Sequence, residues 1–175
     1  ILYNGFYTYW WKPKWIFAAI PGALPGALPV TMGYVANDPQ WLSLDSVYLF
    51  LILFLWQMPH FWCLALRFRE DYRLGGVPTL PASLGVHRTL YHTGLWTFLY
   101  VTIAVLSPWF VHASWVYLLA VVPVVYKIMQ EFYRFYKSEA EQRWFAFFMW
   151  LNVSVLIFLF VPVIDRWSFL FIARG

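Results

Sequence analysis

Long apolar stretches bounded by charged residues dominate the chain. Several charge-free intervals reach or exceed the roughly 20 residues that a helix needs to cross a bilayer. This pattern predicts membrane-spanning helices over residues 15–37, 46–66, 89–107, 110–126 and 144–164. The third and fourth form a hairpin that turns at Ser107-Pro108, and residues 67–88 form a polar loop. The predicted fold class is an all-α polytopic transmembrane helix bundle, a single domain over residues 1–175.

Composition excludes a soluble domain. The chain is 62% apolar, 23% aromatic and 11% charged, whereas an average globular chain is about 45–50% apolar and about 25% charged. The single cysteine, Cys63, cannot form an internal disulfide, and no Cys/His spacing is typical of a zinc site. In a membrane protein the net charge of +4 reflects basic cytoplasmic loops, so we expect no nucleic-acid partner.

The distribution of basic residues predicts which ends of the spans face the cytoplasm. Alternating the sides leaves Arg166 and Arg174 on one side and brings the others together: Lys12, Lys14, Arg67, Arg69, Arg73, Arg88, Lys127, Arg134, Lys137 and Arg143. Short loops rich in Lys and Arg stay in the cytoplasm, which places the 67–88 loop there. The chain opens on Ile1 without the basic region of a signal peptide, so we take Ile1 as a truncation point.

Two polar side chains, Gln57 and His60, lie in the predicted second span. If that helix continues past its basic end, five residues at 3, 4, 3 and 4 spacing share one face: Gln57, His60, Leu64, Arg67 and Asp71. Pro59 lacks an N–H, which predicts a kink beside His60 and room for a ligand. His60 bonding to a neighbouring helix is the structural alternative, but polar groups at this depth and the stripe favour a functional role.

The 67–88 loop contains three arginines around the acidic pair Glu70 and Asp71. In one interpretation it contacts anionic lipid, with both carboxylates paired to arginines. In the other it binds Mg²⁺ and a diphosphate, because carboxylates bind the hard cation while guanidinium groups bind phosphate oxygens. One carboxylate pair is a weak metal signal, so further ligands would have to come from elsewhere.

Several motifs carry a family resemblance: Tyr7-Thr8 with Lys12, then Gly26-Ala27, Pro29 and Gly33-Tyr34, then Leu55-Trp56-Gln57-Met58-Pro59-His60-Phe61, then Asp71-Tyr72, Gly75-Gly76-Val77-Pro78 and Leu80-Pro81. In order and spacing, residues 7–85 resemble the C-terminal half of the protoheme IX farnesyltransferase (heme O synthase) family. That family belongs to the UbiA superfamily of intramembrane prenyltransferases. From Ser107 onward the similarity is mainly in hydropathy.

The resemblance implies a nine-helix fold with a central cavity, of which this chain supplies five helices. It implies transfer of a farnesyl group from farnesyl diphosphate to a vinyl group of heme b, giving heme O. It also implies Mg²⁺ held with diphosphate between two acidic motifs. Asp71 matches the second motif as metal ligand and catalytic residue, and His60 matches a histidine that holds heme or positions its vinyl group. The implied substrate-binding residues are Tyr7, Lys12, Gln57, His60, Arg67 and Tyr72.

The same resemblance implies a location in the bacterial inner membrane, or the mitochondrial inner membrane in a eukaryote, with the site loops on the cytoplasmic or matrix side. Its implied partners are the lipid bilayer and a heme A synthase or terminal oxidase. The chain has Lys12-Pro13-Lys14-Trp15 where the family has Lys-Arg-x-Thr. Because the first acidic motif belongs to the other half, we expect these residues alone to be inactive.

Two other functions remain open from the sequence. One is a prenyltransferase of the same superfamily that acts on an aromatic quinone precursor. The other is a non-catalytic membrane protein that binds heme during oxidase assembly. Whether His60 binds the heme iron also stays open, since spacing gives neither ring orientation nor distance.

Overall fold

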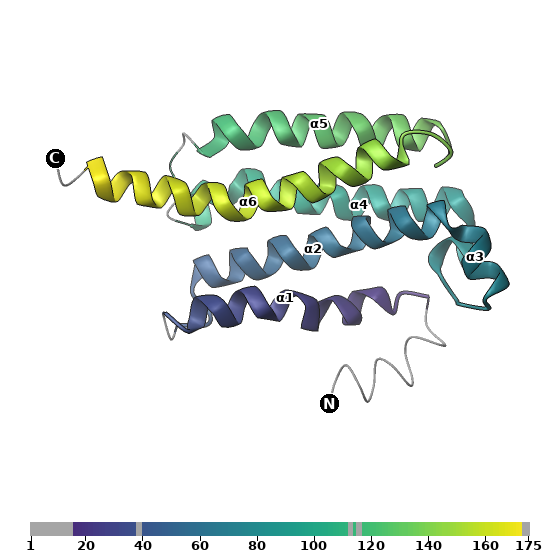
Figure 1. The fold of residues 1–175 in the computed structure, drawn as a ribbon, viewed down its shortest axis with the longest axis horizontal. Coiled ribbons are helices and arrows are strands. Elements are labelled where there is room, and N and C mark those ends of the chain that lie inside the picture. The colour runs from purple at the N-terminus through teal and green to yellow at the C-terminus, as the bar shows by residue number, and fades with distance from the viewer. Residues whose placement is uncertain (1–15, 38–39, 112–113, 115–116, 173–175) are drawn as a thin grey trace.

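The computed structural model describes residues 16–37, 40–111, 114 and 117–172, without the side chains of Phe110 and residues 166–172. This part of the chain contains no strand and six helices: α1 (Ala19–Val35), α2 (Leu44–Arg67), α3 (Arg69–Leu74), α4 (Leu80–Phe110), α5 (Tyr117–Lys137) and α6 (Trp144–Ile172). The five long helices run side by side, and short α3 lies at one end of the bundle (Figure 1). The predicted all-α bundle is confirmed.

Helix α2 is the centre of the bundle, because it packs against α1, α4 and α6. Its N-cap is Ser43, whose hydroxyl accepts a hydrogen bond from the backbone N–H of Ser46 at 3.2 Å. Large side chains along its length, such as Ile52 and Trp62, are fully buried. This central helix carries both polar residues that the sequence singled out, so its neighbours decide what surrounds them.

Three helices have the length and apolar composition needed to cross a membrane: Leu44–Arg67, Leu80–Trp109 and Trp144–Asp165. Many of their outward side chains are large, apolar and exposed, as lipid-facing residues are expected to be. Helix α1 has 17 residues, and α5 carries Lys127, Glu131 and Arg134 in its second half. For these two helices, membrane crossing stays a prediction.

The hairpin between the third and fourth predicted spans turns later than expected. Helix α4 runs through Ser107-Pro108 to Phe110, and the chain becomes extended only at Val111, with φ −119° and ψ 160°. Proline fits helical φ, and within a bundle the loss of one backbone hydrogen bond is tolerated. Ser107-Pro108 therefore lies inside a helix and does not form the turn.

The predicted loop over residues 67–88 is largely helical. It contains all of α3 and the start of α4. Gly85, with φ 80° and ψ 171°, interrupts the first part of α4, a conformation that glycine adopts without steric cost. The glycines and prolines of residues 67–88 indicated a loop, but in the structure they separate or interrupt short helical segments.

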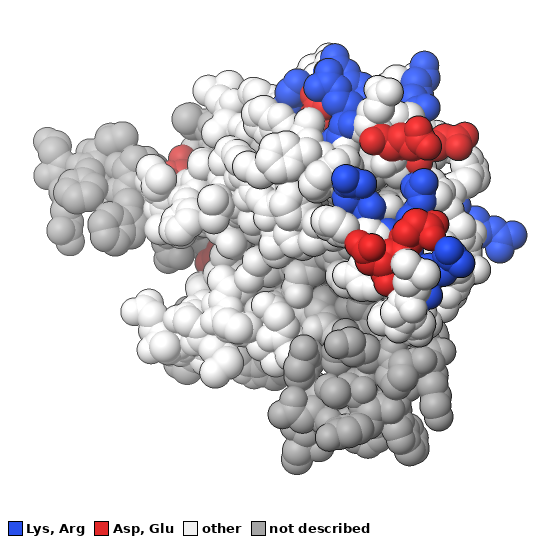
Figure 2. Space-filling model, turned by 45° about the vertical axis from the view of Figure 1, so that its right-hand side comes forward, with Lys and Arg blue, Asp and Glu red and all other residues white. Residues whose placement is uncertain are grey.

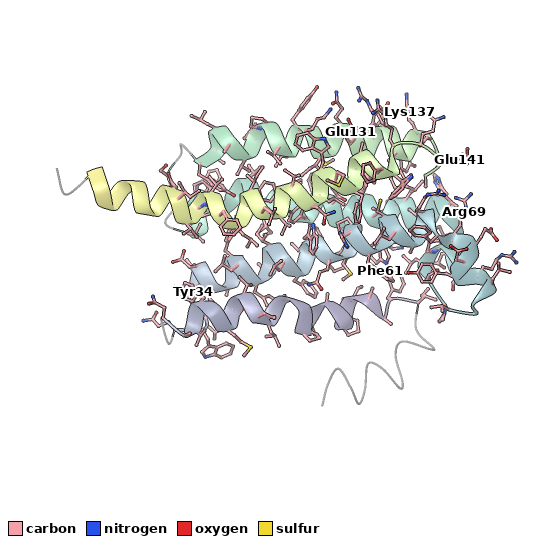
Figure 3. The ribbon with its side chains drawn as sticks, in the orientation of Figure 1. Tyr34, Phe61, Arg69, Glu131, Lys137 and Glu141 are labelled. Atoms are coloured by element: carbon pink, nitrogen blue, oxygen red, sulfur yellow. The ribbon has the colours of Figure 1, made fainter. Side chains whose placement is uncertain are left out.

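Charged side chains gather at the end of the bundle where α2 ends and α3 lies (Figure 2). The end of α5 and the α5–α6 loop contribute to the same end, as the labelled Lys137, Glu141 and Arg69 show in Figure 3. Lys12 and Lys14 lie outside the described residues. Within the described part, the charged residues thus gather at one end of the bundle, and the side of the membrane that this end faces stays a prediction.

Candidate functional site: a charged cavity and an apolar cavity along α2

A charged cavity of about 440 Å³ lies where α2 meets α3. Its charged lining residues are Arg67, Arg69, Glu70, Asp71 and Glu141. The chain bends here because Phe68 has φ −103° and ψ 26°, which ends α2 and starts α3 in a new direction. The bend brings the start of α3 beside the α5–α6 loop, which supplies Glu141.

The two carboxylates of α3 differ in their partners. Glu70 forms an ion pair with Arg73 at 2.9 Å, and both side chains are well exposed. No described residue forms a hydrogen bond or ion pair with the side chain of Asp71, which is also exposed. The lipid-contact interpretation, in which both carboxylates pair with arginines, therefore holds only for Glu70. The carboxylate of Asp71 is available to a cation.

The guanidinium group of Arg67 lies near two aromatic rings. Its guanidinium carbon lies 5.5 Å from the ring centroid of Trp144 and 5.8 Å from that of Phe68. No described acidic residue pairs with it, and its side chain lines the charged cavity. A planar guanidinium that lies near aromatic rings and has no acidic partner among the described residues is suited to bidentate binding of phosphate oxygens.

The donor set at this cavity fits Mg²⁺ in part. Magnesium is usually bound by one or two carboxylates together with substrate phosphates and water. Asp71 offers one such carboxylate beside Arg67 in the same cavity. Across the described residues, no group of three His, Cys, Asp or Glu side chains converges on one point. Asp71 is thus suited to be one ligand of a metal whose other ligands include a bound diphosphate.

A second cavity, of about 350 Å³, lies between α1 and α2. Its lining is mostly apolar, with Gln57 and His60 as its polar side chains. Figure 3 labels Phe61, another lining residue, on the side of α2 that faces α1. The separation of seven positions between His60 and Arg67 corresponds to about 10 Å along the helix. The two cavities therefore follow one helix, the charged one at its end and the apolar one about two turns inside.

Gln57 joins α1 to α2. Its Nε2 donates to the carbonyl oxygens of Ala23 and Leu53, both at 3.1 Å. Its Oε1 lies where a side chain at Gly26 would begin, since a Cβ there would be 2.3 Å away. The structure thus gives Gln57 a clear role in helix packing. Its predicted role in substrate binding rests on its place in the lining of the cavity.

His60 lies between two aromatic side chains. Its ring centroid is 4.4 Å from that of Trp56 and 4.7 Å from that of Phe148. Trp56 is itself fixed, because its Nε1 donates to the carbonyl oxygen of Leu151 at 3.0 Å. The Nδ1 atom of His60 is buried and no described residue forms a hydrogen bond with it. The described contacts therefore include no hydrogen bond from His60 Nδ1 to a neighbouring helix.

The predicted continuous stripe along α2 is wrong at its end. Gln57, His60 and Arg67 share one helix at the expected spacing, but Phe68 breaks that helix before Asp71. A residue in the bridge region of backbone space ends regular helix geometry, and the sequence pattern does not reveal it. Asp71 and Arg67 still line the same charged cavity, because the bend, and not a shared helix face, brings them to it.

The remaining predicted residues have other positions. Tyr7 and Lys12 lie outside the described residues. Tyr72 is half-buried and does not line the charged cavity, and its backbone carbonyl accepts a hydrogen bond from Val77 at 3.0 Å. The predicted binding role of Tyr72 therefore receives no direct support from its contacts.

Sequence reasoning missed Glu141 and Phe148. Glu141 reaches the charged cavity because Glu139 and Ala140 have φ values of 51° and 67°, which turn the α5–α6 loop sharply. Phe148 contacts His60 from α6. Both lie far from the motifs in sequence, and nothing in their local pattern indicates a contact with α2 or α3. Phe148 reaches His60 because α6 packs against α2.

A buried acidic residue stabilises the charged end of the bundle. Glu131 is 2% exposed, and its Oε1 pairs with Lys127 at 2.9 Å and with Arg134 at 3.1 Å. The hydrogen bond from Lys127, together with the nearby charges of Lys127, Arg134 and Arg143, lowers the pKa of Glu131 despite the opposing effect of burial. Glu131 is thus a charged structural group at the end of α5.

Comparison with known proteins shows which family the chain resembles. The family model described as the UbiA prenyltransferase family matches residues 1–153. The chain is 60% identical over 171 residues to a protoheme IX farnesyltransferase of Bdellovibrio bacteriovorus, which covers 98% of this chain and 59% of that protein. It is 31% identical over 169 residues to protoheme IX farnesyltransferase 1 of Bacillus subtilis, covering 94% of this chain and 52% of that protein.

A shorter similarity is found to the protoheme IX farnesyltransferase of Aquifex aeolicus, 46% identical over 66 residues, or 38% of this chain and 22% of that protein. The chain thus spans little more than half the length of the first two relatives. No solved structure matches it. The apolar helices and the family match identify an integral membrane protein. The chain belongs to the UbiA prenyltransferase family.

Proposed function

We propose that the protein of which this chain forms part transfers a farnesyl group from farnesyl diphosphate to a vinyl group of heme b, giving heme O. The observation that carries this proposal is the pair of cavities along α2, with Arg67 and Asp71 at the charged end and His60 in the apolar cavity. The names of the relatives support the same reaction, because each is a protoheme IX farnesyltransferase.

The charged cavity would bind the diphosphate of the prenyl donor. Arg67, held on two aromatic rings, donates hydrogen bonds to phosphate oxygens, and Asp71 binds the cation that accompanies them. A bound Mg²⁺ would neutralise charge on the leaving diphosphate. The residues themselves hold the donor with its diphosphate at the membrane surface and its apolar chain toward the interior.

The apolar cavity would hold part of the heme acceptor. In the reaction the allylic C–O bond of the donor breaks and diphosphate leaves with the bonding electrons. A C–C bond forms between the farnesyl carbon and the terminal vinyl carbon, water adds to the other vinyl carbon, and a proton is released. The apolar lining excludes bulk water from an allylic cation. His60 and Gln57 supply the polar contacts that orient the acceptor.

We place the charged end on the cytoplasmic side of a bacterial inner membrane, or on the matrix side in a mitochondrion. The clustering of the described basic residues at one end of the bundle supports this placement, since short basic loops remain on that side (Figure 2). A heme A synthase or terminal oxidase would use the product, which makes such proteins the partners to test.

The test uses the native full-length protein in membranes, supplied with farnesyl diphosphate, heme b and Mg²⁺, with products measured by mass spectrometry. We expect heme O from the wild type and at least a hundredfold loss in Asp71→Asn, because removal of one charge-stabilising group typically costs that much. Glu139→Gln is the control, since Glu139 is an exposed carboxylate that does not line the charged cavity.

Two outcomes contradict the proposal. If wild-type membranes make no heme O, the reaction is wrong, and conversion of 4-hydroxybenzoate instead would indicate the quinone-type acceptor. If heme O forms but Asp71→Asn matches Glu139→Gln, the reaction stands and the assignment of Asp71 is wrong.

A further inference from the structure

The His60 ring lies between two aromatic neighbours. Trp56 and Phe148 lie on it at centroid distances of 4.4 and 4.7 Å. Trp56 cannot turn freely, because its indole N–H is bonded to Leu151 on α6. The described contacts of the imidazole with these neighbours are therefore ring contacts, which do not use its nitrogen atoms.

The two ring nitrogens of His60 have different surroundings. Nδ1 is buried without a hydrogen-bond partner among the described residues. The side chain also lines the apolar cavity together with Gln57 and Phe61. Because Nδ1 is enclosed, Nε2 is the ring nitrogen that a molecule in the cavity can reach.

This asymmetry decides which nitrogen carries the proton. A neutral imidazole has one N–H donor and one lone-pair acceptor. A proton on Nδ1 would bury an N–H donor with no acceptor among the described residues. Orphaned buried N–H groups are rare in folded proteins, more so than under-satisfied acceptors. The favoured tautomer therefore has its proton on Nε2 and directs an N–H donor at the cavity.

We infer that His60 donates a hydrogen bond from Nε2 to an anionic oxygen of a substrate and does not bind the heme iron; this rests on the proposed function. Iron binding through Nε2 would use its lone pair and would move the proton to Nδ1. Metal-bound histidines almost always donate that second N–H to a carboxylate, a carbonyl or water. No described residue offers such an acceptor to Nδ1 of His60.

The first experiment reads iron coordination directly. Native full-length protein in detergent is loaded with ferric heme b and examined by electron paramagnetic resonance and resonance Raman spectroscopy. We expect the same coordination signature in wild type, His60→Gln and His60→Leu. A histidine-ligand signal that disappears in both His60 variants, but persists in His92→Gln, would overturn the inference. His92 is a suitable control because it lies on α4 and does not line the apolar cavity.

The second experiment measures affinity. Glutamine places an N–H donor at nearly the reach of Nε2, whereas leucine keeps the approximate volume without a donor. We expect His60→Leu to weaken binding of heme b, or of inorganic diphosphate with Mg²⁺, by about tenfold, the effect of one charge-assisted hydrogen bond. His60→Gln should stay within about threefold of wild type. Equal affinities of wild type and His60→Leu for both probes would overturn the inference.

The same titrations identify the oxygen. If the acceptor is a heme carboxylate, the tenfold difference should vanish with heme dimethyl ester, whose carboxylates are blocked. If it is the diphosphate, the difference should appear with inorganic diphosphate and not with heme b. A poorly folding leucine variant does not stop the test, because the coordination signature of His60→Gln alone distinguishes a donor from an iron ligand.

Failure of this inference is distinguishable from failure of the proposed function. Heme O formation by wild-type membranes tests the reaction without reference to His60. Coordination and affinity are measured on protein that turns nothing over. Heme O formation together with loss of a histidine–iron signal in both His60 variants would leave the reaction standing and remove only the donor role of His60.

Discussion

Trp56 and Leu151 form a hydrogen bond, from the indole Nε1 to the carbonyl oxygen at 3.0 Å, that ties α2 to α6 beside His60. Because Trp56 also contacts the ring of His60, this bond joins the bundle core to the apolar cavity. Interhelical hydrogen bonds within a bilayer contribute modestly to stability, on the order of 1 kcal/mol. Its main effect is to position the Trp56 ring, which lines the apolar cavity.

Substitution Trp56→Phe should remove this bond and keep an aromatic ring against His60. We expect a destabilisation of about 1 kcal/mol, since the carbonyl of Leu151 loses its side-chain donor. The measurement is thermal unfolding in detergent, with Trp41→Phe as control because Trp41 is 63% exposed. Equal effects of the two substitutions would show that the bond contributes nothing beyond ring size.

Substitution Gly26→Ala should disturb the contact between α1 and α2. The new Cβ would lie 2.3 Å from Oε1 of Gln57, so the amide must move and weaken its bonds to Ala23 and Leu53. We expect a loss of about 1–3 kcal/mol, typical of overpacking. Gly33→Ala on the same helix is the matched control, since nothing lies within 4 Å of its Cβ position.

The control in that pair carries its own expectation. Alanine has the higher helix propensity, so Gly33→Ala should be neutral or stabilising by up to about 1 kcal/mol. Unfolding of both variants is followed by circular dichroism in the same detergent. A Gly26→Ala protein as stable as Gly33→Ala would contradict the packing role assigned to Gln57.

Substitution Arg67→Lys should weaken diphosphate binding while keeping the charge. Lysine lacks the planar guanidinium that contacts the rings of Trp144 and Phe68 and that binds two phosphate oxygens at once. We expect the KM for farnesyl diphosphate to rise about tenfold or more. Arg73→Lys is the control, because Arg73 is exposed, pairs with Glu70 and does not line the charged cavity.

The Arg67 prediction fails if the two lysine variants give the same KM for the prenyl donor. An effect of Arg67→Lys confined to kcat would also contradict it, since the guanidinium is placed at the bound diphosphate and not at the reacting carbon.

Glu131 should make stability depend on pH. Its pKa is lower in the folded protein than the ordinary value of 4.5, so its pairing with Lys127 and Arg134 stabilises the fold fully above that value. The contribution is lost as the pH falls through the lowered folded-state pKa. Glu131→Gln should therefore have a lower Tm than wild type at neutral pH, and the difference should shrink in acid.

The matched control for Glu131 is the exposed Glu139. Thermal unfolding is recorded for wild type, Glu131→Gln and Glu139→Gln from neutral to acidic pH. A difference between wild type and Glu131→Gln that does not change with pH would show that shape, and not charge, accounts for the role of Glu131.

The sequence was informative where a strong physical cost acts locally. Charged residues are expensive inside a bilayer, so the charge-free intervals located the five long helices of the described structure. Helical spacing likewise placed Gln57 and His60 in one cavity. The exact ends of the helices were less predictable, because a proline can end a helix or lie within one. Pro108 lies within α4.

The features that the sequence did not predict depend mostly on contacts between segments that are distant in the chain. The backbone of Phe68 differs from a helix at one residue, which no periodicity detects. The approach of Glu141 to the charged cavity and of Phe148 to His60 comes from how α5 and α6 pack on α2. Periodicity reports which face of a helix is apolar, and it contains no information about which side chain will be found opposite.

The bend at Phe68 has an evolutionary consequence. It places Asp71 on α3 and His60 on α2, so a substitution in α3 changes part of the lining of the charged cavity without changing any residue that lines the apolar cavity. Under the proposed function, recognition of the prenyl donor and of its acceptor can then change by independent mutations. Descendants of such a protein can exchange one substrate for another without first rebuilding the site for both.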